Sequence, residues 1–517
     1  MFPEQRYLGL RFAALLLLAI SLVDLLLMVG LTGIHAARPG LFSPDVLAPM
    51  TFILAGASFG SAVLAFLYAM LRYPQYRGTI LALVLILSAV LAAHMYTIGL
   101  PSTANCHDSG KNVDGCIMDE VYYVPSAQTL LSGEKCAPYA DNCNLEHPFL
   151  SKAIIAAGIA IFGNNVFGWR IFEVLLGTFS IPLVFGICWA ITRNARFSLF
   201  ASFLLAFETL FFVQSSITVI DIHAIFFGLL GILFYVADVH WWRFSRTTLA
   251  GIAMGLSALS KETSIFLLLV LVGYVLLMSG GGRRQRMVTS LELLLTVFVV
   301  FAVGLQAYDS LFGSGTATTF VGQISFILSY GKSLVGPGWK DAVLAALLHI
   351  DTYYITPLNW ITYYSPIGYL VTNVSVTGPT GSYTYVAAGY YGIADQFMVW
   401  LTYLWGGIVA YYVIKKRASS MDAEWVRDFQ LAKFALLWFL IIFGSYAALF
   451  LYGRVTYPYY FIQAIPGIAI GCAYLLSRQW FPREVAYMVL LGVGFWFFLY
   501  YPDKAFLPNQ LRVWLGR

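Results

Sequence analysis

Long runs of apolar residues, separated by short polar segments, make up most of the 517-residue chain. Runs such as residues 8–34 and 78–100 are long enough to cross about 30 Å of hydrocarbon as helices. The alternating pattern of a membrane β-barrel is absent from the sequence. The pattern predicts an all-α, polytopic membrane protein with about thirteen transmembrane helices. The predicted spans are residues 8–34, 49–71, 78–100, 169–192, 197–216, 219–237, two short helices within 247–278, 287–312, 396–414, 431–452, 457–476 and 485–501.

Residues 247–278 need two helices because arginines flank both ends while Lys261 and Glu262 interrupt the middle. A single span would place cytoplasmic arginines on opposite sides of the membrane, against the positive-inside rule. Two short helices that turn at Ser260–Glu262 on the outer side satisfy it. A single span with both charges facing the bundle interior is the alternative.

The same rule sets the predicted orientation. Arg72 and Arg77 lie between the second and third spans and place that turn, and with it the N-terminus, in the cytoplasm. Residues 101–168 and 313–395 then form two outer loops, and residues 150–163 are expected to lie as a helix in the membrane interface. We expect residues 1–517 to form a single transmembrane domain without a separate soluble domain.

Composition supports this class, with 60% hydrophobic and 11% charged residues where a soluble domain carries about 25% charged residues. The net charge of +5 is small and sits in short loops, which argues against a nucleic-acid partner. The first apolar run has no small-residue cleavage site, so a retained helix is expected rather than a signal peptide.

Four of the six cysteines, Cys106, Cys116, Cys136 and Cys143, lie in the first outer loop. An even number in a polar loop on an oxidising face suggests two disulfides. The simplest pairing is 106–116 and 136–143, although three pairings are possible. A zinc site is the competing interpretation, and the lack of any CxxC spacing argues against it.

The first outer loop also carries the adjacent carboxylates Asp119 and Glu120. They open a segment with the pattern of a surface-lying helix, which Pro125 should shorten or kink. Neighbouring residues on a helix point about 100° apart, so the two carboxylates should not share a proton. One can face a buried site while the other braces it or faces water. The alternative is that both are solvated loop charges.

Residues 146–152, EHPFLSK, close the same loop. Proline suits the first helical turn, which would place His147 near a helix N-cap and Lys152 one turn inside. Backbone N–H groups, the helix dipole and two potential cations would then form an anion site suited to phosphate. An ordinary helix that begins at proline, with a surface lysine, is the alternative.

Asp-Glu, followed about thirty residues later by His-Pro-x-x-x-Lys, resembles the first lumenal loop of the dolichyl-phosphate-mannose protein O-mannosyltransferases. These enzymes belong to the GT-C superfamily of membrane glycosyltransferases. The resemblance continues to about residue 310 and includes Arg170, Gln214 with Asp221, and Lys261; Arg454 resembles a looser GT-C feature. Phe149 and Ser216 depart from the family pattern, and the second outer loop is too short for the eukaryotic sugar-binding insert. These departures leave the acceptor open.

The resemblance implies a GT-C type helical bundle that transfers a hexose, with mannose the first choice, from a polyprenyl- or dolichyl-phosphate carrier to a Ser/Thr hydroxyl with inversion. It implies Asp119 as the base and Glu120 as its support, with Asp221 and Gln214 as supporting residues. Neither a metal nor another cofactor is expected. The expected partners are the lipid bilayer, the lipid-phosphate sugar and an acceptor protein or peptide.

Fixed cations should stabilise the lipid phosphate as it leaves. The candidates are Arg170, His147, Lys152, Lys261 and Arg454. Arg170 ranks first because a bidentate guanidinium suits phosphate, although an arginine at this position can also snorkel to the interface.

A GT-C transferase with a lipid or glycan acceptor, similar to the aminoarabinose transferases, is the nearest rival. A transporter is a more distant one, because helical repeats are missing and the polar groups gather on one face. The retained helices favour a prokaryotic plasma membrane over the endoplasmic reticulum. The sequence leaves the oligomeric state open.

Overall fold

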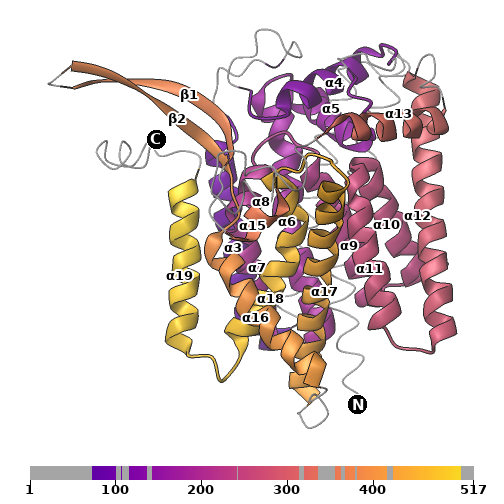
Figure 1. Ribbon diagram of the computed structural model, residues 1–517, viewed down its shortest axis with the longest axis vertical. Helices are drawn as coiled ribbons and strands as arrows, with labels where there is room; N and C mark the ends of the chain where they lie inside the picture. The colour runs from indigo at the N-terminus through magenta and orange to yellow at the C-terminus, as the bar shows by residue number, and fades with distance from the viewer. Residues whose placement is uncertain are drawn as a thin grey trace.

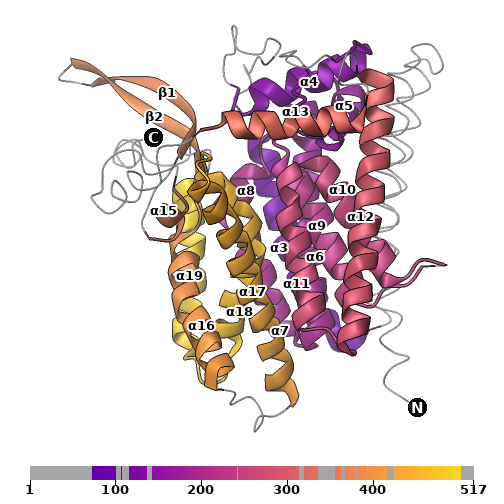
Figure 2. The same cartoon turned by 45° about the vertical axis from the view of Figure 1, so that its right-hand side comes forward.

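The computed structural model describes residues 73–100, 106, 116–136, 143–241, 243–313, 319–335, 356–362, 367–378, 381–415 and 423–501. The predicted spans 8–34 and 49–71 lie outside these residues, so the predicted total of thirteen is not tested. Most of the described helices stand side by side in a bundle (Figures 1 and 2).

Seven segments of the described chain are helical, long and apolar enough to cross a membrane. They confirm the prediction of a multi-pass helical membrane protein. Their helices are α3 (Arg77–Thr97) with the short η1 (Pro74–Tyr76) before it, α6 (Val166–Thr192), α12 (Arg283–Phe312), α16 (Gln396–Lys415), α17 (Ala423–Leu451), α18 (Ile465–Ser477) with η6 (Pro458–Ala464) before it, and α19 (Arg483–Tyr500).

Shorter helices fill the space between them. The two-helix prediction for residues 247–278 is confirmed, since α10 (Arg246–Ser260) ends at Lys261 and α11 (Ile265–Leu277) follows the single turn η2 (Glu262–Ser264). The predicted single span 197–216 is wrong. It divides into α7 (Ala195–Ala206) and α8 (Thr209–Gln214), and α9 (Asp221–Val236) follows.

The break between α7 and α8 is centred on Glu208, which makes one local and one long-range hydrogen bond. The Glu208 carboxylate caps α8 by accepting a hydrogen bond from the Phe211 backbone N–H at 2.7 Å. Its other oxygen accepts one from the Asp395 backbone N–H at 2.8 Å. A buried carboxylate that is bonded on both sides holds the chain in this turn, because a continuous helix would leave it unpaired.

Small residues let α10 and α12 pack closely. A Cβ atom on Gly251 would lie 2.6 Å from the Thr296 side chain, and one on Gly255 would lie 2.6 Å from the Val300 side chain. The four-residue spacing puts both glycines on one face of α10, as in other tightly packed membrane helices.

The helix α18 lies at the centre of the bundle, where every residue from Ile465 to Ser477 is buried. Trp438 of α17 and Trp405 of α16 pack against its glycines, Gly467 and Gly471. The core of the bundle is therefore apolar and aromatic around α18.

One end of the bundle, here called the loop end, is covered by α4 (Glu120–Ser132), α5 (Leu150–Phe162) and α13 (Phe320–Ser333) (Figure 2). The predicted helix after Asp119 is confirmed as α4, which ends where Gly133 takes a left-handed φ of 72°. The helix predicted over 150–163 is also present, as α5. Its first ten residues are buried by protein, since α4, α6 and α10 pack around it.

The second loop contains structure that the sequence analysis missed. Strands β1 (Ile367–Gly378) and β2 (Gly381–Gly392) form an antiparallel hairpin in which Ile367 pairs with Gly392. The short helix α15 (Pro357–Thr362) precedes it. The signal available in the sequence was the run of valines, threonines and tyrosines on either side of the residues Gly-Pro-Thr-Gly, which favour a turn.

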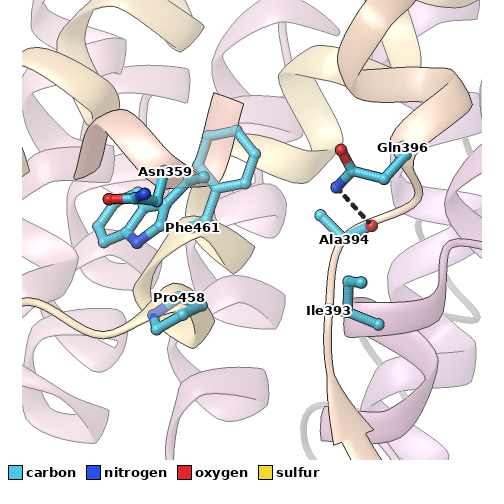
Figure 3. Close-up of a pocket in the computed structure, with 7 residues that line it drawn as sticks. Asn359, Ile393, Ala394, Gln396, Pro458 and Phe461 are labelled. Carbon is cyan, nitrogen blue, oxygen red and sulfur yellow. Dashed lines mark hydrogen bonds between the residues drawn. The ribbon is translucent and has the colours of Figure 1, made fainter. Parts of the chain in front are cut away.

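A small cavity lies beneath the hairpin, where α15, η6 and the start of α16 meet (Figure 3). Its volume is about 20 Å³, and its walls include Asn359, Trp360, Gln396 and Phe461.

Candidate active site

A tight turn at residues 117–120 separates the two neighbouring carboxylates. The Glu120 backbone N–H donates to the Ile117 carbonyl at 3.2 Å, and the Ile117 N–H donates to the Glu120 carboxylate at 2.9 Å. Met118 takes a left-handed φ of 53°, which is uncommon outside glycine. Strained backbone of this kind often marks a functional site. The turn leaves Asp119 at the N-cap of α4 and directs Glu120 into the protein.

Glu120 and Arg170 form a completely buried ion pair. Arg170 Nε and Nη2 donate to the two Glu120 carboxylate oxygens at 2.6 and 2.8 Å. Arg170 Nη1 donates to the Ile98 carbonyl at 3.1 Å and also to the Leu100 carbonyl. Glu120 accepts a further bond from the Thr218 backbone N–H at 3.0 Å.

These contacts bear on the phosphate role predicted for Arg170. Both ends of its guanidinium are already bonded, and its side chain has no exposed surface. The contacts favour Arg170 as the residue that fixes Glu120, and through Glu120 the turn that carries Asp119. The supporting role predicted for Glu120 fits the same geometry.

Asp119 lies in different surroundings. Within the described residues its carboxylate makes no hydrogen bond. Burial raises the pKa of Asp119, the nearby charges of Lys261 and His147 lower it, and Asp221 raises it. Among the described residues the Asp119 carboxylate is therefore unpartnered, and it is partly desolvated and close to two potential cations.

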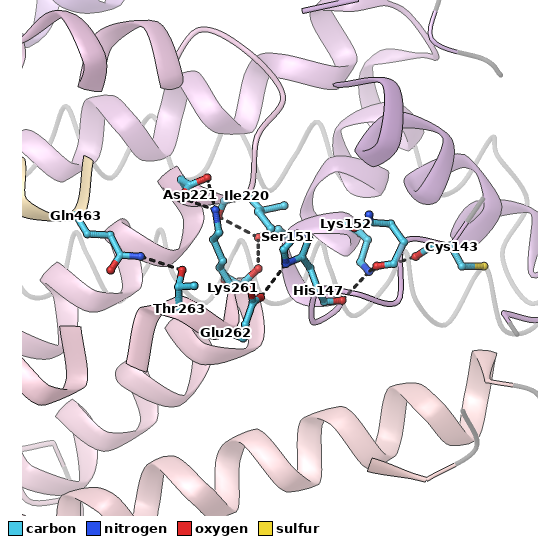
Figure 4. A network of polar contacts seen from close by, with 12 residues as sticks. Cys143, His147, Ser151, Lys152, Ile220, Asp221, Lys261, Glu262, Thr263 and Gln463 are labelled. Atoms are coloured by element: carbon cyan, nitrogen blue, oxygen red, sulfur yellow. Dashed lines mark hydrogen bonds and ion pairs between the residues drawn. The ribbon is translucent and has the colours of Figure 1, made fainter. Parts of the chain in front are cut away.

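Lys261 lies at the break between α10 and α11 and pairs with Asp221 at the start of α9. Its ammonium donates to both Asp221 oxygens at 2.7 Å (Figure 4). The same ammonium lies 5.7 Å from the ring centre of Tyr459 and 5.3 Å from that of Tyr460. Aromatic faces stabilise a cation without neutralising it. The structure thus brings Asp221 and Lys261 together near Asp119.

His147 reaches this group from the first loop. Its Nδ1 atom lies 2.8 Å from the Glu262 carboxylate (Figure 4). Its ring packs edge-on against Tyr123. Glu262 was missed as a site residue, although its place beside Lys261 in the sequence was a signal. The helix that follows His147 begins at Leu150 with Phe149 as its N-cap, two residues later than predicted.

Lys152 points away from this group and holds the loop together. Its ammonium donates to three carbonyls, those of Cys143, Asn144 and His147, at 3.2, 2.6 and 2.9 Å. An ammonium has three N–H donors, so all of them are used. Burial lowers the pKa of Lys152 to about 8. These contacts favour a structural role and leave no donor for the phosphate that the sequence predicted there.

Arg454 and Gln214 complete the set of predicted residues. Arg454 is half-buried near Gly331 of α13, and its Nε atom has no hydrogen-bond partner in the described part of the chain. Gln214 donates to the Tyr369 hydroxyl at 2.8 Å and so anchors the hairpin to α8. Arg454 is therefore better placed than Arg170 to offer free donors to a ligand.

Both disulfides form as the simplest pairing predicted, Cys106 with Cys116 and Cys136 with Cys143. Cys188 and Cys472 are buried and free, as expected for cysteines within helices. No group of three or more His, Cys, Asp or Glu side chains in the described residues is arranged to hold a metal ion.

Residues 146–305 match the family model described as dolichyl-phosphate-mannose-protein mannosyltransferase. Over these residues the chain is similar to this mannosyltransferase family. The match includes His147, Arg170, Asp221 and Lys261, whereas Asp119, Glu120 and Arg454 lie outside it. The family resemblance noted from the sequence is confirmed.

Two curated relatives are similar to part of this chain and differ in the sugar that their names give. A polyprenol-phosphate-mannose–protein mannosyltransferase from Mycobacterium tuberculosis is 28% identical over 33% of this chain and 37% of the relative. An undecaprenyl phosphate-alpha-4-amino-4-deoxy-L-arabinose arabinosyl transferase from Pseudomonas paraeruginosa is 33% identical over 30% of each chain. The match thus spans only about a third of either relative.

The fold is similar to that of the S. cerevisiae protein O-mannosyltransferase Pmt1-Pmt2 complex, solved with its sugar donor. The TM-score is 0.59 at 11% identity, covering 82% of this chain and 90% of that chain. This similarity confirms the predicted fold, a bundle of membrane helices like that of the yeast enzyme.

Proposed function

We propose that the protein transfers a hexose from a polyprenyl-phosphate carrier to a hydroxyl group, with mannose as the sugar and a Ser or Thr side chain of a protein as the acceptor. The mannosyltransferase match over residues 146–305 and the mycobacterial relative support this choice. The protein is a multi-pass membrane protein, and we place the loop end on the outer face of a prokaryotic plasma membrane.

In this proposal Asp119 acts as the general base. An acceptor hydroxyl is a weak nucleophile, and a positioned carboxylate accelerates its attack by taking the proton. The hydroxyl oxygen bonds to the anomeric carbon as the bond to the phosphate oxygen breaks, which inverts the anomeric centre. The proton passes to Asp119, and the electron pair leaves with the lipid phosphate.

Positive groups around Asp119 receive the charge that develops on the phosphate. Lys261, His147 and Arg454 are the candidates, because each retains donor capacity or charge near the site. Asp221 uses two of the three Lys261 ammonium donors and leaves one. Preorganised donors of this kind each contribute about 3–4 kcal/mol to transition-state stabilisation. In this assignment Arg170 and Lys152 act by holding the backbone that carries Asp119 and His147.

One observation carries the proposal. Of two adjacent carboxylates, Glu120 is bonded to Arg170 and backbone N–H groups, while Asp119 makes no hydrogen bond within the described residues and lies near Lys261 and His147. A base needs an accessible carboxylate, and only Asp119 of the pair provides one.

The test is transfer of radiolabelled mannose from polyprenyl-phosphate mannose to a Ser/Thr-containing peptide by the purified protein. Asp119→Asn should lower the rate by about 10²–10⁴-fold, as expected for a lost general base, with the melting temperature little changed. The same substitution at the exposed Asp238 is the control and should leave transfer unchanged. Full turnover by the Asp119→Asn variant would exclude Asp119 as the base.

A lipid acceptor is the second candidate, favoured by the 33% identity to the aminoarabinose transferase. The donor site would be the same, and only the attacking hydroxyl would differ. Presenting a peptide and a lipid acceptor to one preparation separates the two candidates, since the true acceptor alone should consume the donor.

A further inference from the structure

The cavity beneath the hairpin gathers several polar atoms that have no partner. Both amide atoms of Asn359, the indole N–H of Trp360 and the Oε1 atom of Gln396 make no hydrogen bond within the described residues. All three side chains line the cavity and are at least 95% buried. Figure 3 shows Asn359 and Gln396 on opposite walls, with Pro458 and Phe461 beside Asn359.

An arrangement of this kind is costly without a ligand. Each buried polar group left unpaired costs about 1–3 kcal/mol, and folded proteins leave few of them. Four such atoms around one cavity, contributed by α15 and α16, indicate a site that something else completes.

The chemistry of the walls limits what can bind. Asn359 Nδ2 and Trp360 Nε1 are donors, whereas Asn359 Oδ1 and Gln396 Oε1 are acceptors. The ligand group must therefore both donate and accept. No charged side chain lines the cavity, which disfavours phosphate, and the four unpaired polar atoms disfavour a hydrocarbon chain, which would leave them unpaired. The volume of about 20 Å³ admits a group about as large as a water molecule. A hydroxyl group meets all of these requirements.

Aromatic rings connect the cavity with the candidate active site. The Trp360 ring lies 5.8 Å from that of Phe461 and 5.7 Å from that of Tyr446. Tyr446 stacks on Tyr460 at 5.3 Å, and Tyr460 faces the Lys261 ammonium. Two rings thus lie between the cavity and the ammonium. Rings next to hydrogen-bonding groups suit a sugar, whose C–H faces pack on aromatic carbon while its hydroxyls bind polar atoms.

We propose that this cavity is a subsite for one hydroxyl group of a carbohydrate, bound by Asn359, Trp360 and Gln396. The inference rests on the proposed sugar transfer and adds a specificity site to it. The hydroxyl belongs either to the sugar being transferred or to a sugar already present on the acceptor. The binding chemistry is the same in both cases.

The experiment compares a hexose donor with its monodeoxy analogues, and a mannosylated acceptor with its monodeoxy analogues, in the full-length protein. With the wild-type protein, kcat/KM for one deoxy compound should be lower than that for its parent by about tenfold or more, as expected for a lost hydrogen bond to a buried partner. Whether that compound is a donor or an acceptor identifies the source of the hydroxyl.

Two variants then test the residues. Asn359→Leu and Trp360→Phe should lower kcat/KM for the parent compound and abolish the difference between it and that deoxy analogue. Trp360→Phe keeps a ring, so it serves even if Asn359→Leu fails to fold. The control, Trp400→Phe on the exposed face of α16, should leave the difference intact. The inference is wrong if the wild type has the same kcat/KM for every deoxy compound as for its parent. It is also wrong if the variants still discriminate between the parent and the deoxy analogue. In either case the cavity would hold water only.

A second readout requires no turnover. Methyl mannoside at millimolar concentration should raise the melting temperature of the wild type but not that of Trp360→Phe. If the wild type transfers no sugar yet shows this shift, the proposed function fails and the subsite stands. If neither transfer nor a shift is seen, both fail.

Discussion

Replacing Arg170 by methionine should destabilise the protein before it affects catalysis. The substitution removes four hydrogen bonds and leaves the Glu120 carboxylate, which has no exposed surface, without its counter-charge. Removing one partner of a buried ion pair costs about 3–5 kcal/mol. That cost corresponds to about a hundred- to several-thousand-fold change in the unfolding equilibrium.

The matched double variant separates charge from packing. Arg170→Met combined with Glu120→Gln removes both charges, so most of the lost stability should return, because replacing a buried pair by neutral groups is often close to neutral. Arg196→Met, at an exposed arginine, is the control and should change stability by less than about 1 kcal/mol.

The first assay is thermal unfolding in detergent, in which the fraction of protein that remains monodisperse reports the folded fraction. The second assay measures donor binding at a temperature where every variant is folded. The bracing role predicts a large loss of stability in the single variant and recovery in the double variant. If Arg170→Met melts like the wild type but no longer binds the lipid-phosphate sugar, Arg170 contacts the phosphate, as the sequence alone suggested, and the reasoning from its contacts is refuted.

The remaining predictions concern the charge on Asp119 and the first loop. Because burial raises the pKa of Asp119 and the base must be ionised, transfer should fall on acidification at a higher pH than the ordinary aspartate value of about 3.9. Lys261→Met removes a charge that lowers this pKa, so the same fall should begin at a still higher pH. Replacing Cys136 and Cys143 by serine should cost about 2–3 kcal/mol, since the bond closes a short loop, and should weaken donor binding through His147.

Each of these predictions has a contrary result. A transfer rate that stays constant down to pH 4 would exclude a raised pKa for the base. If the rate of the Lys261→Met variant falls at the same pH as that of the wild type, the charge of Lys261 does not act on Asp119. Wild-type donor affinity in the cysteine variant would show that the loop holds His147 without the disulfide.

The features that the sequence predicted well depend on local pattern. Span length follows from hydropathy, and the break at Lys261 follows from a charged pair inside an apolar run flanked by cytoplasmic arginines. The two disulfides follow from proximity in the chain, since each closes a loop of about ten residues or fewer.

The features that it missed depend on partners far away in the chain. Arg170 pairs with a carboxylate fifty residues earlier, and nothing in the local pattern distinguishes that pairing from phosphate binding. The helix break at Glu208 depends on Asp395, 187 residues later. Lys152 is different, because its partners are near in the chain: it was predicted to bind phosphate, whereas three carbonyls of its own loop accept its donors, and an irregular loop has no sequence pattern that shows this.

The most direct measurement of the central claim is a structure of the protein with a non-hydrolysable polyprenyl-phosphate sugar bound. The account predicts the phosphate within hydrogen-bonding distance of Lys261, His147 or Arg454, the anomeric carbon facing the Asp119 carboxylate, and the Glu120–Arg170 pair unchanged. A phosphate bonded to Arg170 after that pair has opened, or a sugar whose anomeric carbon lies away from Asp119, would contradict it.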